Sequence, residues 1–182
     1  MMRLRRQIWR RFAKSTRGIA AVEFAMVLPV LTVLFLASFD GGRAIAVYMK
    51  VRTASYTLAA IANQYASIND AAMSGIFTAT SDVLAPYSTV PLALTVSQIA
   101  IDANGNATVN WSSTQGGTAR TVGSSITVPV NLATPNSYLI LSEVKYSYVP
   151  MFGYFNKGAA IGLSDSLYVT PRSTTLVART SP

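Results

Sequence analysis

The feature that most constrains this chain is an apolar run of 21 residues, Ile19 to Phe39, whose only charged residue is Glu23. As an α-helix this run would be about 31 Å long, close to the roughly 30 Å hydrocarbon core of a bilayer. It is longer than the apolar core of a secretory signal, and no clean Ala-x-Ala cleavage site follows it. The sequence therefore predicts a retained transmembrane helix over residues 19–40.

The distribution of charge predicts how this helix is oriented. Seven of the 15 basic residues precede Gly18, and no acidic residue lies among them. From Ile19 onward, eight basic residues stand against seven acidic ones, so the net charge of +8 comes almost wholly from the N-terminal leader. The positive-inside rule then places residues 1–18 in the cytoplasm and residues 41–182 on the other side of the membrane. Because this body is nearly neutral, we expect no nucleic-acid partner.

Glu23 is the most informative residue of the run, because a carboxylate in a membrane helix is costly and usually has a partner or a function. It lies five residues after Gly18, at the cytoplasmic end of the run. A basic leader, Gly18, four apolar residues and Glu23 together resemble the cleavage region of type IV prepilins and pseudopilins. The resemblance implies that a prepilin peptidase cuts between Gly18 and Ile19.

The spacing of these residues agrees with that chemistry. Cleavage would create an α-amine at Ile19 that is mostly protonated at neutral pH. Glu23 would lie one helical turn further on, about 6 Å deeper in the membrane. The carboxylate could pair with this amine or with that of a neighbouring subunit, and the resemblance implies the intermolecular pair. A lone interfacial glutamate without a role is the alternative.

A closer resemblance rests on the stretch AAVEFAMVLPVLTVLFLASFDGGRA. It is similar to the N-terminal segment of TadE-like proteins over roughly residues 17–60, through the Glu23–Phe24 pair and an apolar run that contains Pro29. Pro29 cannot donate to the carbonyl of Ala25, so a local kink is expected there. Major pilins of the same system are much shorter and follow the glutamate with tyrosine, which favours the minor class for this chain.

This resemblance implies a minor pseudopilin of a tight-adherence (type IVc) pilus in the bacterial inner membrane. The body would then lie in the periplasm, and the protein could be incorporated in the pilus. Glu23 and Phe24 would serve assembly through the N-terminal helix, which would prime, cap or support the pilus. The implied partners are the prepilin peptidase, other minor pseudopilins and the major pilin.

The body predicts an α+β, pilin-like fold in residues 41–182. Apolar residues at three- and four-residue steps predict an amphipathic helix over residues 44–65, continuous with the membrane helix and packed on a sheet. Asn69 or Asp70 offers the N-cap of a second, short helix that ends before Pro86. The remainder predicts a small antiparallel sheet, with a hairpin at Asn104-Gly105 and strands over residues 138–149 and 163–169.

An aromatic cluster follows the first of these late strands. It can be a core or sheet-edge cluster, which is the commoner case, or an exposed interaction patch. Its members are Tyr146, Tyr148, Phe152, Tyr154 and Phe155.

A catalytic role is hard to build from this composition. The chain has no histidine and no cysteine, which excludes Ser-His-Asp and Cys-His arrangements and removes the usual zinc ligands. No phosphate-binding G-x-x-x-x-G-K-[ST] motif is present. We therefore expect neither an enzyme, nor a cofactor or metal, nor a small-molecule substrate.

A second interpretation stays open beside the pseudopilin. An uncleaved, single-pass membrane-anchored periplasmic binding or sensing domain would carry the same apolar run. The two interpretations differ at Gly18, which only the pseudopilin needs for cleavage.

Overall fold

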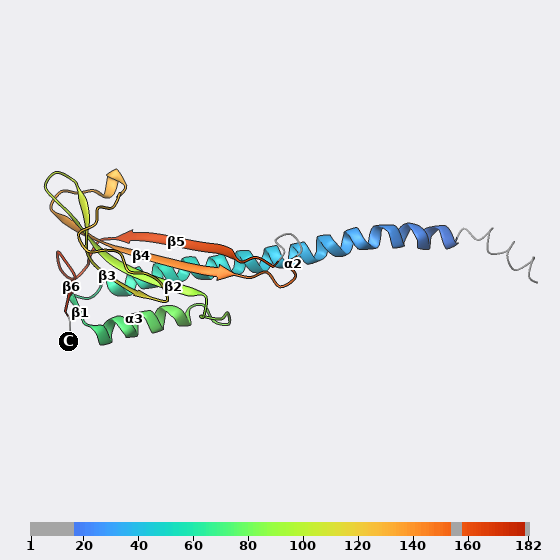
Figure 1. Ribbon diagram of the computed structural model, residues 1–182, viewed down its shortest axis with the longest axis horizontal. Coiled ribbons are helices and arrows are strands. Elements are labelled where there is room, and N and C mark those ends of the chain that lie inside the picture. The colour runs from blue at the N-terminus through green and yellow to red at the C-terminus, as the bar shows by residue number, and fades with distance from the viewer. Residues whose placement is uncertain (1–16, 154–157, 181–182) are drawn as a thin grey trace, which may run out of the picture.

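The computed structural model describes residues 17–153 and 158–180. Its longest element is the helix α2 (Arg17–Ala62), whose 46 residues extend over about 70 Å. The first half of α2 projects from the rest of the molecule as a single rod, as Figure 1 shows. Residues 43–153 and 158–180 form the packed part of the structure, which we call the head.

The second half of α2 lies in the head because its apolar residues gather on one face. Burying a Val or Leu side chain there contributes about 1.5–3 kcal/mol. The three- and four-residue pattern places Ile45 and Tyr48 on the buried face, but both are exposed while Val47 is buried. The helix also ends at Ala62 rather than at the predicted Tyr65. The buried face consists of Val47, Val51, Ala54, Ser55, Leu58, Ala59 and Ala62.

The short helix α3 (Asp70–Asp82) packs beside α2. Asn69 caps it as predicted, because its side-chain oxygen accepts the N–H of Ala72 at 2.8 Å. Met73, Ile76 and Phe77 are its buried apolar residues. The spacing of these three residues turns one apolar face of α3 toward the core.

The predicted antiparallel sheet is present and has four strands in the order β3-β2-β4-β5. The strands β2 (Leu92–Ile101) and β3 (Ala107–Gln115) form the hairpin predicted from Asn104-Gly105. Gly105 adopts a φ of +83°, which glycine reaches without strain. The strands β4 (Ser137–Tyr148) and β5 (Ile161–Val169) form a second hairpin.

The two faces of the sheet are covered differently. On the helix face, α2 and α3 pack over Leu94, Val96 and Ile140. On the opposite face, the end of the sheet near the β2–β3 turn carries a smaller apolar cluster around Ile99 and Leu141. Residues 116–136, including the 3-10 turn η1 (Val130–Leu132), supply Ile126, Val128 and Leu132 to cover this cluster.

A two-residue parallel pair closes the far end of the head. The strands β1 (Ser67–Ile68) and β6 (Ala178–Arg179) pair side by side. The indole N–H of Trp111 donates to the carbonyl of Val177 at 2.8 Å, and Arg179 forms an ion pair with Asp70. These contacts fix residues 177–179 beneath the start of α3.

The α+β fold class is confirmed, with a long N-terminal apolar helix, one further helix and a small antiparallel sheet. The aromatic cluster is divided. Tyr146 and Tyr148 are buried in the core, whereas Phe152 is 42% exposed. Tyr154 and Phe155 lie outside the described residues.

Candidate functional site

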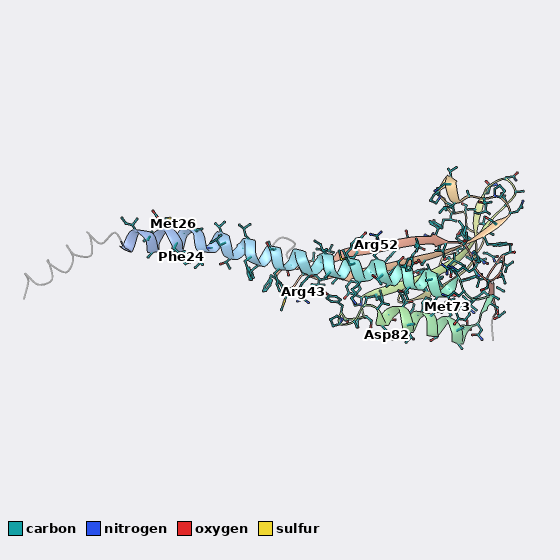
Figure 2. All side chains as sticks on the ribbon, turned by 180° about the vertical axis from the view of Figure 1, so that it is seen from behind. Phe24, Met26, Arg43, Arg52, Met73 and Asp82 are labelled. Atoms are coloured by element: carbon teal, nitrogen blue, oxygen red, sulfur yellow. The ribbon has the colours of Figure 1, made fainter. Side chains whose placement is uncertain are left out.

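The free part of α2, residues 18–39, is the most conspicuous surface of the molecule. In the described chain, α2 is the one helix long and apolar enough to cross a membrane, and none of its most apolar stretch is buried. Figure 2 shows Phe24 and Met26 on this rod, far from the head. Phe24 is 61% exposed and Met26 is 75% exposed. Such a surface needs either lipid or a partner helix around it.

The residues predicted for processing lie at the start of this rod. The described helix begins at Arg17, so the bond between Gly18 and Ile19 lies in its first turn. No other part of the described chain comes within 4 Å of a Cβ built at Gly18. Residues 1–16 of the predicted leader (residues 1–18) lie outside the described residues. Cleavage after Gly18 therefore stays a prediction.

Glu23 lies one turn beyond Ile19 on the same side of the helix. It is exposed, and it has no hydrogen-bond or ion-pair partner among residues 17–153 and 158–180. Phe24 faces outward beside it. A carboxylate in this position is available to a group supplied from outside the described chain.

Pro29 stands within α2, which continues helically on both sides of it. The hydroxyl of Thr32 donates to the carbonyl of Leu28 at 2.8 Å, and so supplies a side-chain donor in the turn around the proline. The kink predicted at Pro29 stays a prediction.

A contact that was not predicted joins α2 to the connection between β4 and β5. The carboxylate of Asp40 accepts backbone N–H groups of three consecutive residues: Met151 at 3.1 Å, Phe152 at 3.1 Å and Gly153 at 3.2 Å. A carboxylate bound by several N–H groups makes charge-assisted hydrogen bonds, which are stronger than neutral ones. We call this arrangement the Asp40 clasp.

Two side-chain contacts extend the Asp40 clasp. The rings of Phe39 and Phe152 meet edge to face, with 5.8 Å between their centroids. The Arg43 guanidinium approaches the Sδ atom of Met151 at 3.4 Å and also lies 5.8 Å from the centre of the Phe39 ring. The last apolar turn of the rod is thereby fastened to residues 151–153.

Tyr148 lies at the base of this junction, in the last position of β4. It is 6% exposed, and its hydroxyl has no hydrogen-bond partner in the part of the chain that the structure describes. Burial raises the pKa of the Tyr148 phenol, although the positive charge of Arg43 acts in the opposite direction. The phenol is therefore neutral at physiological pH.

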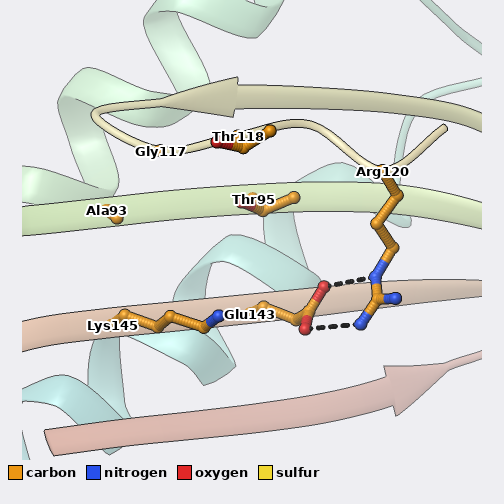
Figure 3. Close-up of a pocket in the computed structure, with 7 residues that line it drawn as sticks. All are labelled: Ala93, Thr95, Gly117, Thr118, Arg120, Glu143 and Lys145. Atoms are coloured by element: carbon orange, nitrogen blue, oxygen red, sulfur yellow. Dashed lines mark hydrogen bonds and ion pairs between the residues drawn. The ribbon is translucent and has the colours of Figure 1, made fainter. Parts of the chain in front are cut away.

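A shallow polar groove crosses the sheet face opposite the helices (Figure 3). Its volume is about 430 Å³, and Thr95, Thr118 and Lys145 are among its lining residues. Across it, Arg120 donates two hydrogen bonds to the carboxylate of Glu143, at 2.7 and 2.8 Å. Within the described residues, no group of three His, Cys, Asp or Glu side chains is placed to hold a metal ion.

Together, the exposed apolar rod and the α+β head fit a protein anchored in a membrane by one helix. The family model described as TadE-like protein matches residues 18–60, about a quarter of the chain. This match confirms the resemblance read from the same residues, and with the apolar helix it fits a membrane protein associated with a Tad pilus system. No curated protein and no solved structure matches the chain. The pilin-like character of the head therefore stays a prediction.

Proposed function

We propose that this chain is a minor pseudopilin of a tight-adherence (type IVc) pilus system. A prepilin peptidase cuts it after Gly18, and the mature chain assembles through the free part of α2. In this role the protein is not an enzyme, and it primes, caps or supports the pilus. Its partners are the peptidase, other minor pseudopilins and the major pilin.

The observation that carries this proposal is the carboxylate of Glu23 on an exposed apolar helix, where it has no partner among residues 17–153 and 158–180. An intramembrane carboxylate without a partner is unfavourable in the lone chain. A protonated α-amine at Ile19 of a neighbouring subunit would neutralise it. The cost of leaving Glu23 unpaired then becomes a driving force for side-by-side packing of helices.

The head supports the minor class. It retains a fold of its own, with a core that begins at Val47 on α2 and includes both hairpins. A subunit with such a head can present a specific surface at a pilus end or base. The side chains of residues 18–32 remain exposed and free for helix packing.

The polar groove favours a second candidate, an uncleaved membrane-anchored binding or sensing domain. Lys145, Thr95 and Thr118 place a cation and two hydroxyl groups around a concave surface of the sheet. In this case Gly18 has no special role, and a Gly18→Val variant works as well as the natural chain.

N-terminal sequencing and intact mass distinguish the two candidates. The full chain is expressed in the bacterial membrane with and without a prepilin peptidase of the tight-adherence type. We expect a mature chain that begins at Ile19 only when the peptidase is present, and an uncut chain for Gly18→Val. An intact N-terminus under both conditions would leave the anchored binding domain as the better explanation.

A further inference from the structure

The connection between β4 and β5 lies at the point where the apolar rod enters the head. Asp40 is the first residue after the apolar run, and it binds the backbone of Met151, Phe152 and Gly153. In Figure 1 the strands β4 and β5 run along α2. The sheet register agrees with this placement. The start of β4 pairs Ser137 with Ile101 near the β2–β3 turn, so the end of β4 lies at the opposite end of the sheet.

The length of α2 indicates at which depth this connection lies relative to a bilayer. Phe39 lies 20 residues beyond Ile19, which is about 30 Å along a helix and matches the hydrocarbon thickness. With Ile19 at one boundary, Phe39 lies at the other. Phe152 touches the Phe39 ring and therefore lies at the same boundary.

The exposed side chains of this connection have the chemistry of that boundary. Residues 149–153 read Val-Pro-Met-Phe-Gly and contain no charge. Val149 is 59% exposed, Met151 is 66% exposed and Phe152 is 42% exposed. In water, three neighbouring apolar side chains with this exposure are unfavourable, whereas the interface of a bilayer accepts them.

The rod itself supplies a second indication. Most of its side chains are exposed, but those of Val33, Leu36 and Ala37 are half-buried and lie on the same face as Asp40. This face of α2 is therefore less exposed than the others up to two turns below Asp40, inside the apolar run.

We propose that residues 149–153 form a second membrane contact, which inserts into the headgroup and upper acyl region of the leaflet where α2 emerges. The Asp40 clasp holds Val149, Met151 and Phe152 at that level. The occupant of this surface is phospholipid, because the surface is continuous with the lipid-facing side of α2. The inference requires only that α2 spans a membrane, and it does not depend on cleavage after Gly18.

Two contacts with the bilayer constrain the head more than one does. A lone helix leaves the head free to rotate about the helix axis. A lipid-embedded connection on one side of α2 fixes which side of the head faces the membrane. The distal end, with the β2–β3 turn, would then point away from the bilayer.

Depth-dependent fluorescence quenching tests this contact, and the absence of cysteine makes every introduced thiol unique. Val149→Cys, Met151→Cys, Leu34→Cys and Val130→Cys are each labelled with an environment-sensitive fluorophore in the full chain. The proteins are reconstituted in vesicles of phosphatidylethanolamine and phosphatidylglycerol that carry a nitroxide at the headgroup or deep in the acyl chain. Val130 is 93% exposed at the distal end of the head, and it serves as the matched control.

We expect the label at position 149 or 151 to lose most of its emission with the headgroup nitroxide, and the label at 130 to lose none. The label at position 34 should respond to the deep nitroxide. Unquenched emission at both 149 and 151, with quenching at 34, would overturn the inference.

Two further outcomes would also overturn it. Emission at 149 that is shielded from water, insensitive to both nitroxides and dependent on the protein-to-lipid ratio would mean that a second copy covers the surface. An unquenched label at position 34 would remove the span on which the inference rests.

A chain that is cut after Gly18 but unquenched at 149 and 151 would overturn this inference and leave the pseudopilin proposal intact.

Discussion

Asp40 shows how one carboxylate can connect parts of a chain that lie far apart in sequence. It accepts N–H groups that lie 111 to 113 residues away. These N–H groups belong to residues that lie in neither a helix nor a strand. Asp40 therefore supplies the acceptor that a backbone carbonyl supplies in regular structure. The clasp therefore orders residues 151–153 as well as attaching them.

Replacing Asp40 should release this connection. In Asp40→Ala, the amides of Met151, Phe152 and Gly153 lose their acceptor, and we expect hydrogen exchange there to accelerate at least about tenfold, since a charge-assisted bond contributes about 1.5–3 kcal/mol. Hydrogen exchange by mass spectrometry on the full chain in detergent measures this. Asp82→Ala is the matched control, because Asp82 is an exposed carboxylate at the end of α3. Equal exchange in both variants would show that the clasp does not order the connection.

In the proposed pseudopilin, Glu23 would act at the same scale but toward another molecule. We expect Glu23→Ala to abolish pilus assembly while the chain is still inserted and cut after Gly18, because the partner of the Ile19 amine is lost. Immunoblotting of sheared pili and of the membrane fraction measures the two steps separately. Val27→Ala, one turn deeper on the same face, should assemble normally. Normal pili in the Glu23→Ala strain would contradict the assigned role.

The contrast between these two carboxylates shows what sequence reasoning reaches at the residue scale. A role for Glu23 could be predicted from its neighbours in sequence, Gly18 before it and an apolar run around it, and this role stays a prediction. Asp40 was given no role from the sequence. Nothing in the sequence pairs it with residues 151–153, because that contact exists only after β4 has been placed along α2.

Among the elements, those with local signals were predicted well. The cap at Asn69 and the turn at Asn104-Gly105 depend on a few adjacent residues, and both are present in the structure. The pair β1–β6 and the cover formed by residues 116–136 were not predicted. Two-residue strands carry no periodicity, and the cover is recognised only once the apolar cluster beneath it exists.

Substitutions at two glycines test the exposure of α3 and the packing of the end of β3 against β2. Gly75 lies on the exposed face of α3, and nothing would contact a Cβ there. Gly75→Ala should therefore raise the free energy of unfolding by about 0.5–1 kcal/mol. Gly116 has a φ of +72°, and a Cβ would lie 2.4 Å from the carbonyl oxygen of Leu92. Gly116→Ala should lower the free energy of unfolding by about 1–3 kcal/mol. Urea unfolding in mild detergent measures both.

The opposite signs make this pair its own control. A loss of stability in Gly75→Ala would mean that α3 is less exposed or less helical than described. A neutral Gly116→Ala would mean that the strand end at Gln115 is not held against β2 as closely as the structure shows.

At the scale of the whole molecule, the chain divides into the rod, whose exposed side chains are apolar, and the head, which has its own core. The core begins at Val47 and contains no residue of the rod. The match to TadE-like proteins ends at residue 60, so most of the head lies beyond it. The head was predicted as α+β from periodicity together with cap and turn signals, and its strand order could not be derived from a pattern of short apolar runs.

Removal of the rod should leave this core intact. We expect a chain of residues 40–182, which keeps the Asp40 clasp, to remain in solution without detergent and to keep the circular dichroism of an α+β protein. Gel filtration and circular dichroism measure these properties, with the full chain as the control that needs detergent. Precipitation, or loss of the strand signal, would mean that the head depends on residues 17–39 for its fold.

The continuity of α2 sets an angular relation across the membrane boundary. The helix passes from Glu23 through Asp40 and into the head without an interruption, even at Gly41 and Gly42. Successive residues of an α-helix are rotated by about 100° around its axis. The direction in which Glu23 points inside the bilayer therefore determines the orientation of the sheet about the axis of α2 outside it. A single residue added between the two would turn the head by more than a quarter of a circle, so the length of the rod encodes an angle as well as a depth.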